Sequence, residues 1–323
     1  MKKYFYLITI ALAVSFSFRA HAAVTSTPVN LDTKKTLSLK EKLKALTKQS
    51  NRTQSDALIF DLPVTYNKKV STWIHYYQTK GRKWFREWLE RSSQHMPPIQ
   101  NELQQAGLPQ DLAYMVMIES GFSANAVSSA QAVGPWQFIE TTGNRYGLSR
   151  NWWLDERRDY HKSTVAATKY LRDLYQEFGS WYLVAASYNM GESGLRRQIS
   201  RHGTKDFWTL IRAKALPAET EEYVPKILAA MLIAKAPNLY GFRNLEHMSP
   251  LTYDVVSAPG GTDLDLIADH LGITHKALKD LNAELLLGYI PRQIDRHFIR
   301  VPRGSQKIVT DYIQQNSQKV AWK

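Results

Sequence analysis

The chain has 323 residues, of which 44% are hydrophobic and none is cysteine, and its formal net charge is +13. This length suits about two domains with a hydrophobic core, and the lack of cysteine excludes a disulfide framework and a lipid-bearing N-terminal cysteine. The positive charge favours a polyanion or an anionic surface as partner, or else spreads over the surface and keeps the chain soluble.

The N-terminus has the pattern of a secretory signal peptide. A basic start, MKK, precedes the apolar run YFYLITIALAVSFSF, and Ala20 and Ala22 form an A-x-A cleavage site. The run is shorter than the roughly 20 residues that span a bilayer, so we expect cleavage after Ala22 and no transmembrane segment afterwards. Removal of residues 1–22 takes away three of the 13 net positive charges and leaves 10.

Two regions precede the part of the chain that carries chemical motifs. Residues 23–60 are rich in Lys, Thr and Ser and predict a leader or linker with at most one short helix. Residues 61–105 are predicted to form a helical support region, because large apolar residues recur there at helical spacing. They are Trp73, Ile74, Tyr77, Trp84, Phe85 and Trp88.

A run of helices broken by Gly and Pro is predicted over residues 106–242, most clearly at 163–178, 181–190 and 219–236. Strand-like alternation is nearly missing from this region. We therefore expect an all-α domain.

One helix of this region is expected to carry a carboxylate among apolar side chains. Start and stop signals predict that it begins at Pro109 and ends at Gly121. Leu112, Met115 and Glu119 would then share one face. A carboxylate is seldom placed there for stability, so Glu119 is the first candidate for chemistry.

The character of the sequence changes at Pro250. TYDVVSAPGGT and HFIRVP predict strands, and DLDLIADHLG and HKALKDLNAEL predict short amphipathic helices. Residues 250–303 therefore predict a small βααβ module, and residues 304–323 a tail with a terminal helix. The fold class expected for the chain is mainly α, with this module after the helical domain.

The motifs of several enzyme classes are missing from the sequence. It has no GxSxG nucleophile elbow, no P-loop, no Rossmann glycine fingerprint and no HExxH motif, and its histidines are scattered. We therefore expect neither a metal nor a cofactor.

A glutamate that is desolvated against apolar side chains, as expected for Glu119, has a raised pKa and can serve as a general acid near neutral pH. Glycosidic cleavage needs such an acid, and hydrolytic glycosidases usually add a second carboxylate as nucleophile or base. The candidates for a second carboxylate are Asp155, Glu140 and Glu219, and the sequence does not choose among them.

Four ordered motifs resemble the catalytic domain of a known enzyme family. They are ESGFSANAVSSAQAVGPWQFIETTGNRYGL, NWWLDERRD, AASYNMGE and AETEEYVPKILAA. Together, over about residues 61–242, they resemble the SLT catalytic domain of lytic murein transglycosylases, nearest to the membrane-bound lytic murein transglycosylase D type. The resemblance implies a goose-lysozyme-like α-helical fold and cleavage of the β-1,4 bond between N-acetylmuramic acid and N-acetylglucosamine in peptidoglycan.

The resemblance also implies how one carboxyl group can suffice. Glu119 would protonate the leaving oxygen and then, as a base, take a proton from the C6 hydroxyl group of the muramic acid, which attacks C1 and leaves a 1,6-anhydro end. The implied class is that of exotransglycosylase-type carbon–oxygen lyases, and cleavage within glycan strands is left open. The alternatives are a hydrolytic muramidase on the same fold and a catalytically silent peptidoglycan-binding protein.

The family's motifs align six further residues with the glycan site. Four would line the saccharide groove, and the last two would form its floor near the scissile bond: Ser128, Gln137, Tyr188 and Asn189, then Glu219 and Tyr223. Two positions depart from the usual pattern, because Pro135 stands where Leu or Ile is common and Ser187 replaces an Ala. We expect these departures to tune activity without abolishing it.

The C-terminal module resembles a LysM domain, which binds glycans that contain N-acetylglucosamine. The pattern is matched at Tyr253, Thr262, Ile267, Ala268, Leu281, Asn282, Val301 and Pro302. Gly261 stands where Asp is usual. Glycan binding by the module and packing against the catalytic domain alone are both left open.

These expectations place the protein outside the cytoplasm, in the periplasm, either soluble or peripherally associated with the cell wall. The expected partner is the glycan strand of peptidoglycan, since a basic protein is attracted to an anionic wall polymer. Partners in the cell-wall or secretion machinery are left open. We expect no nucleic-acid partner, and a monomer, because nothing in the sequence argues for an oligomer.

Overall fold

The computed structural model describes residues 60–320 of the chain. The signal peptide predicted for residues 1–22 and the leader predicted for residues 23–60 lie outside the described residues, apart from Phe60. From Asp61 onward the described residues form one compact unit.

Helices α2 (Lys68–Gln78) and α3 (Arg82–Gln105) lie within residues 61–105, where the aromatic spacing predicts helices. They are held together by an aromatic cluster, in which the rings of Tyr77 and Phe85 stack with their centroids 4.2 Å apart. Both side chains are almost fully buried. Aromatic pairs of this kind add to the stabilisation from apolar burial, so the two helices pack as a pair.

The helix predicted to begin at Pro109 is divided in the structure. Pro109 precedes the 3-10 helix η1 (Gln110–Ala113), and α4 (Tyr114–Ser120) follows it. The carboxylate of Asp61 accepts hydrogen bonds from the backbone N–H groups of Gln110 and Asp111, at 2.6 and 3.0 Å. This carboxylate thus pairs the donors of the first turn, and the α-helical part starts later than the sequence predicted.

The remaining elements of the helical part follow in chain order. They are α5 (Glu140–Arg145), η2 (Glu156–Arg158), α6 (Tyr160–Phe178), α7 (Trp181–Met190), α8 (Glu192–His202), α9 (Phe207–Arg212), α10 (Ala218–Lys235) and η3 (Pro237–Tyr240). The three helices predicted most clearly correspond to α6, α7 and α10, each within three residues at either end.

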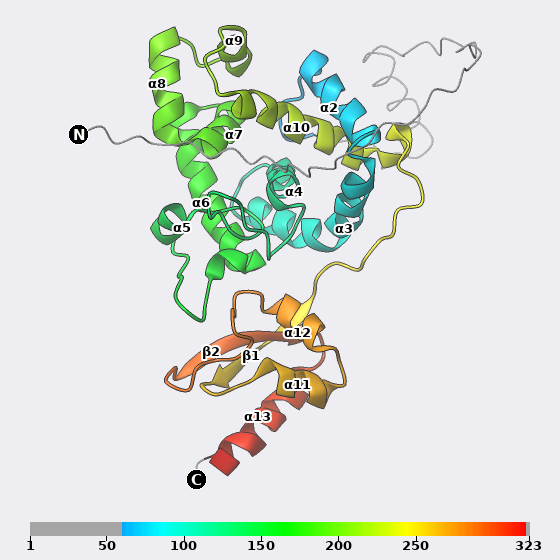
Figure 1. The fold of residues 1–323 in the computed structure, drawn as a ribbon, viewed down its shortest axis with the longest axis vertical. Helices are drawn as coiled ribbons and strands as arrows, with labels where there is room; N and C mark the ends of the chain where they lie inside the picture. Colours follow the sequence, from blue (N-terminus) through cyan, green and yellow to red (C-terminus); the bar gives the residue numbers. More distant parts are fainter. Residues whose placement is uncertain (1–59, 321–323) are drawn as a thin grey trace, which may run out of the picture. The chain divides into compact units, whose positions relative to one another are not determined.

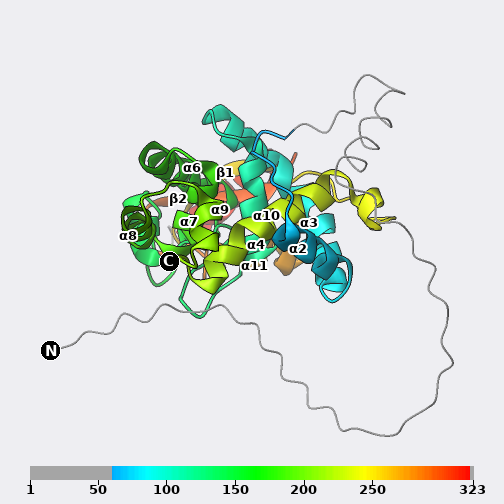
Figure 2. The same ribbon diagram turned by 90° about the horizontal axis from the view of Figure 1, so that it is seen from above.

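Helix α10 is the central packing element of this part. It contacts α2, α4 and α7, and α4 and α10 lie side by side in both views (Figures 1 and 2). Eleven of its residues are buried, from Thr220 to Ile233. Since α10 is apolar on nearly all sides, it lies inside the helical domain and can bring its polar first turn to a defined place beside α4.

The C-terminal part has the βααβ order that the sequence predicted (Figure 1). Strands β1 (Tyr253–Pro259) and β2 (Arg296–Pro302) pair antiparallel, with Tyr253 opposite Pro302. Helices α11 (Leu264–Leu271) and α12 (His275–Leu281) lie between them in sequence.

The predicted terminal helix is present as α13 (Gln306–Val320). It packs on β1 and α11, and Val309 is fully buried in the core of the module. The mainly α fold class with a small two-stranded sheet is therefore confirmed. Within residues 60–320 no helix is both long enough and apolar enough to cross a membrane.

Candidate active site

Glu119 lies in the last turn of α4, immediately before a sharp change of chain direction. Gly121 ends the helix in the left-handed conformation, with φ at 56°. A Cβ atom on Gly121 would lie 2.1 Å from Nε1 of Trp88, and Arg91 donates a hydrogen bond of 2.5 Å to the carbonyl oxygen of Gly121. The turn after Glu119 therefore requires glycine for both backbone conformation and space.

The surroundings of Glu119 favour its neutral form. The preceding residues Met115, Val116 and Met117 are fully buried, whereas Glu119 is half-buried. Burial raises the pKa of the Glu119 carboxyl group from 4.5 to about 7, with a smaller contribution in the same direction from the negative charge of Glu219. A carboxyl group with this pKa can donate or accept a proton near neutral pH.

Helix α10 presents three polar residues around Glu119. The hydroxyl group of the buried Tyr223 donates a hydrogen bond to Oε1 of Glu119, and this bond lowers the pKa of the carboxyl group. The positive charge of Lys226 also lowers this pKa, whereas the negative charge of Glu219 raises it. Two groups thus favour the carboxylate, and burial and one like charge disfavour it.

Sequence reasoning missed Lys226, whose ammonium group lies 4.8 Å from the ring centroid of Trp73. Helical spacing could have found it, because Lys226 follows Tyr223 by three residues and Glu219 by seven.

The end of α7 connects the site to two other segments. The hydroxyl group of Tyr188 donates a hydrogen bond of 2.6 Å to the carbonyl oxygen of Trp136. The hydroxyl group of Thr220 donates one of 2.7 Å to Oδ1 of Asn189. The charge of Glu119 adds to burial in raising the pKa of Tyr188, so this tyrosine lies close to the carboxyl group.

Gln137 and Ser128 are joined to the backbone of their own loop. The amide Nε2 of Gln137 donates to the carbonyl oxygens of Gly134 and Ala126, at 2.8 and 3.2 Å, and its φ of 50° is unusual for a residue with a side chain. Oγ of Ser128 accepts a hydrogen bond of 3.0 Å from the backbone N–H of Ala132. Both side chains therefore stabilise the loop 126–138.

A direct hydrogen bond ties this loop to α4. Ser120, the neighbour of Glu119, donates from Oγ to the carbonyl oxygen of Pro135 at 2.8 Å. The loop and the carboxyl group are thus held in one arrangement.

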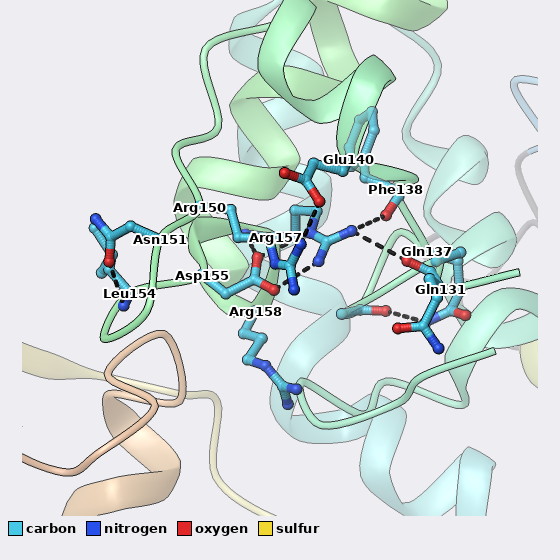
Figure 3. Close-up of polar contacts among 12 residues, drawn as sticks. Gln131, Gln137, Phe138, Glu140, Arg150, Asn151, Leu154, Asp155, Arg157 and Arg158 are labelled. Carbon is cyan, nitrogen blue, oxygen red and sulfur yellow. Dashed lines mark hydrogen bonds and ion pairs between the residues drawn. The ribbon is translucent and has the colours of Figure 1, made fainter. Parts of the chain in front are cut away.

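The two other candidate carboxylates are engaged in ion pairs away from this cluster. Asp155 is 3% exposed, and its two oxygens accept hydrogen bonds of 2.8 and 2.7 Å from Nε and Nη2 of Arg157 (Figure 3). Glu140 is exposed and pairs with Arg150. A two-pronged buried pair of this kind indicates a structural role for Asp155. Neither residue has the setting of a base that activates water.

The departure at Ser187 leaves a buried hydroxyl group. Ser187 is fully buried in α7, and its Oγ has no hydrogen-bond partner within the described part of the chain. Residues 60–320 also hold no group of three His, Asp or Glu side chains arranged as a metal site.

Comparisons with known proteins give two matching family models. Residues 96–211 match the family model of the Transglycosylase SLT domain, and residues 252–317 match that of the LysM-like domain of lytic transglycosylase MltD. Two successive segments of the chain thus match an SLT transglycosylase domain and a LysM-like domain. The resemblance to lytic murein transglycosylases predicted from the motifs is confirmed.

Two curated relatives are named membrane-bound lytic murein transglycosylase D, from Escherichia coli strain K12 and from an O6:H1 strain. Each is 36% identical to this chain over 200 residues, which cover 60% of this chain and 43% of the relative. A putative tributyltin chloride resistance protein from Alteromonas sp. (strain M-1) is 29% identical over 156 residues, 47% of this chain and 75% of the relative. The chain thus spans less than half the length of the E. coli relatives it matches.

The solved structure of an inactive mutant of the lytic transglycosylase Slt from Pseudomonas aeruginosa is 18% identical. The aligned region covers 62% of this chain and 31% of the Slt chain, with a TM-score of 0.38.

Proposed function

We propose that the protein is a peptidoglycan lytic transglycosylase in which Glu119 is the catalytic acid and base. The observation that carries this proposal is the half-buried Glu119 carboxyl group, with a pKa raised to about 7 and a hydrogen bond from Tyr223. The matches to the Transglycosylase SLT domain and to the LysM-like domain of lytic transglycosylase MltD support it.

The chemistry follows from the two protonation states of Glu119. The neutral carboxyl group donates its proton to the leaving glycosidic oxygen while the bond from that oxygen to C1 of the muramic acid breaks. The resulting carboxylate, stabilised by Tyr223 and Lys226, takes the proton of the C6 hydroxyl group as O6 forms a bond to C1. Glu119 ends in its starting state, and no water is consumed.

Four further residues are proposed to position the glycan. Tyr188 and Asn189 lie at the end of α7. The amide nitrogen of Asn189, whose Oδ1 accepts from Thr220, can donate hydrogen bonds to acetamido and ring oxygens as charge develops. The hydroxyl oxygen of Tyr188, whose proton goes to the carbonyl oxygen of Trp136, can accept one. Ser128 and Gln137 would shape the glycan site through the loop that they hold together. Glu219 contributes by keeping part of Glu119 protonated near neutral pH.

The hydrolytic alternative is less well supported. It requires a second carboxylate that activates water, and the two candidates outside α10 are already paired, Asp155 with Arg157 and Glu140 with Arg150. The third candidate, Glu219, has a negative charge that raises the pKa of Glu119, as expected for two neighbouring carboxyl groups.

The wider biology is proposed on the same basis. We place residues 1–22 in a cleaved signal peptide, residues 23–60 in a leader, residues 61–105 in the support region and residues 106–242 in the catalytic domain. Residues 250–303 form the LysM-like module and residues 304–323 the tail. The enzyme would then act as an exported monomer on peptidoglycan glycan strands in the periplasm, either soluble or peripherally associated with the cell wall.

The LysM-like module is proposed to bind the glycan strand as well. A cavity of about 350 Å³ lies between the turn after β1 and helix α13, with Thr262, Arg292 and Tyr312 in its lining. Polar and aromatic side chains together suit a sugar face. Loss of pelleting with insoluble peptidoglycan in Arg292→Ala, compared with the wild-type protein, would support this site, and unchanged pelleting would argue for a module that only packs.

The proposed reaction is tested by the fate of the oxygen atom at C1. Peptidoglycan digested in water enriched in ¹⁸O should yield muropeptides with 1,6-anhydro ends that carry no ¹⁸O, because O6 of the same sugar is the nucleophile. Reducing ends that contain ¹⁸O would instead establish a hydrolase. Tight binding without any soluble product would favour the catalytically silent binding protein.

A further inference from the structure

The segment 149–159 of the helical domain is built into the LysM-like module. The backbone N–H of Leu286 donates to the carbonyl oxygen of Trp153 at 2.8 Å, and the N–H of Asp155 donates to the carbonyl oxygen of Glu284 at 2.9 Å. Between these bonds, Leu154 forms an antiparallel bridge with Leu285. Paired backbone groups of this kind fix two segments in register.

Two side chains of the same segment complete the apolar core of the module. Trp153 and Leu154 are each 6% exposed and pack in one cluster with module residues that include Ile299 and Val301. The module therefore lacks part of its core without the helical domain. A flexibly tethered binding module would not share its core in this way.

A buried ion-pair network joins the same two regions. Arg300 of β2 donates from Nη1 to Oε1 of Glu284 at 2.7 Å and from Nη2 to Oδ2 of Asp159, the residue before α6. The side chains of Asp159, Glu284 and Arg300 are only 1%, 3% and 13% exposed. Loss of the arginine would leave two buried carboxylates without their cation, so the network constrains the geometry strongly.

The opposite side of segment 149–159 supports the loop beside Glu119. Arg157 is held by Asp155 and donates from Nη1 to the carbonyl oxygens of Gln131 and Phe138, at 3.1 Å each (Figure 3). The carbonyl oxygen of Arg157 lies so close to Gly134 that a Cβ atom there would be 1.8 Å away. The loop thus rests directly on this segment.

The loop is in turn hydrogen-bonded to residues of the proposed site. The carbonyl oxygen of Pro135 accepts a hydrogen bond from Ser120, next to Glu119, and that of Trp136 accepts one from Tyr188. Every link between Arg300 and the site is therefore a hydrogen bond, an ion pair or a backbone contact, without a gap.

We propose that Arg300 is a positioning residue for catalysis: by docking the LysM-like module on Asp159, it holds segment 149–159 and, through Arg157, the loop beside Glu119. The module then serves the reaction as a structural support in addition to any affinity for glycan. The effect on turnover rests on the proposed function. The structural coupling between Arg300 and the loop 126–138 can be measured without any assumption about function.

The test compares Arg300→Met with Arg296→Met in the full chain. Arg296 lies on the same strand, is exposed and bonds only within the module, to Ser257 at 2.8 and 2.9 Å. Hydrogen exchange of residues 131–138 gives the first readout, since the N–H groups of Val133 and Gly134 are bonded inside the loop. The second readout is kcat and KM on a short, soluble, uncross-linked glycan.

In Arg300→Met we expect exchange in the loop to rise about tenfold, and kcat to fall about tenfold with KM changed by less than about twofold. Arg296→Met should match the wild type in all three quantities. If Arg300→Met does not fold, Arg300→Lys keeps the charge without the two-pronged geometry and should show the same changes at reduced size.

Faster exchange at residues 153–155 and 284–286, together with unchanged exchange in the loop and unchanged kcat, would overturn the proposal. A wild-type enzyme that gives no 1,6-anhydro product would contradict the proposed function alone, because the exchange experiment would still test the link.

Discussion

The hydroxyl group of Tyr223 donates a hydrogen bond to Oε1 of Glu119 across 104 positions of sequence. This bond favours the carboxylate, whereas burial favours the neutral acid, and the pKa of Glu119 lies at about 7 as a result. A single group can then act as acid and as base in one catalytic cycle near neutral pH.

The first prediction concerns the dependence of activity on pH. Since the reaction starts with neutral Glu119, kcat/KM should be constant on the acid side and fall above about pH 7. In Tyr223→Phe the carboxylate loses its hydrogen bond, so the pKa rises and the alkaline fall should move up by about one pH unit. Initial rates on soluble glycan between pH 5 and 9 give both profiles. A fall that stays in place or moves down would contradict the role of Tyr223.

The second prediction uses two charges with opposite effects on the same group. Glu219 raises the pKa of Glu119 and Lys226 lowers it. Glu219→Gln should therefore move the alkaline fall of kcat/KM to lower pH, and Lys226→Met should move it to higher pH, each by a few tenths of a unit to about one unit. Equal shifts in the same direction would show that these charges do not control Glu119.

The third prediction compares two glycines that both have positive φ. Gly134 and Gly147 have φ of 84° and 89°, but only at Gly134 would a Cβ atom meet another atom, the carbonyl oxygen of Arg157 at 1.8 Å. Gly147→Ala should lower the free energy of unfolding by about 1–2 kcal/mol, from backbone strain alone. Gly134→Ala should lower it by about 3 kcal/mol or more, because the loop must also move. Urea unfolding measures both, and equal losses would contradict the crowding at Gly134.

The fourth prediction concerns the buried hydroxyl group in α7. Ser187 is fully buried with an unpaired Oγ, so Ser187→Ala should raise the free energy of unfolding by about 1 kcal/mol while leaving the fold unchanged. Ser163→Ala is the matched control, because the equally buried Ser163 donates to the carbonyl oxygen of Asp159. Calorimetry should show a higher Tm for the first variant and a Tm no higher than wild type for the second.

Local signals in the sequence predicted much of the fold. The helices α6, α7 and α10 and the βααβ order of the module follow from apolar periodicity and from Gly and Pro at the ends of elements. Glu119 could be singled out because its helix is apolar and stops at Gly121. The α-helical part starts later than the sequence predicts, since the 3-10 helix η1 precedes α4 and its first N–H groups bond to Asp61, some 50 residues upstream.

The contacts between distant segments could not be predicted in the same way. The hydrogen bond from Tyr223 to Glu119 and the ion pair of Arg300 with Asp159 join residues more than 100 positions apart. The part played by Asp155 also depended on the structure, because a carboxylate in a sequence can be a base or the partner of a nearby arginine. Tertiary packing decides such cases, and one sequence contains no local signal for it.

The most direct test of the central claim is mass spectrometry of muropeptides released from intact peptidoglycan by three proteins: wild type, Glu119→Gln and Glu140→Gln. The wild type and Glu140→Gln should release products with 1,6-anhydro ends at comparable rates, because Glu140 is an exposed partner of Arg150. Glu119→Gln should bind the wall and keep its fold, but release these products about 10²–10⁴ times more slowly. Anhydro products formed by Glu119→Gln at the wild-type rate would contradict the assignment of Glu119 as the catalytic acid and base.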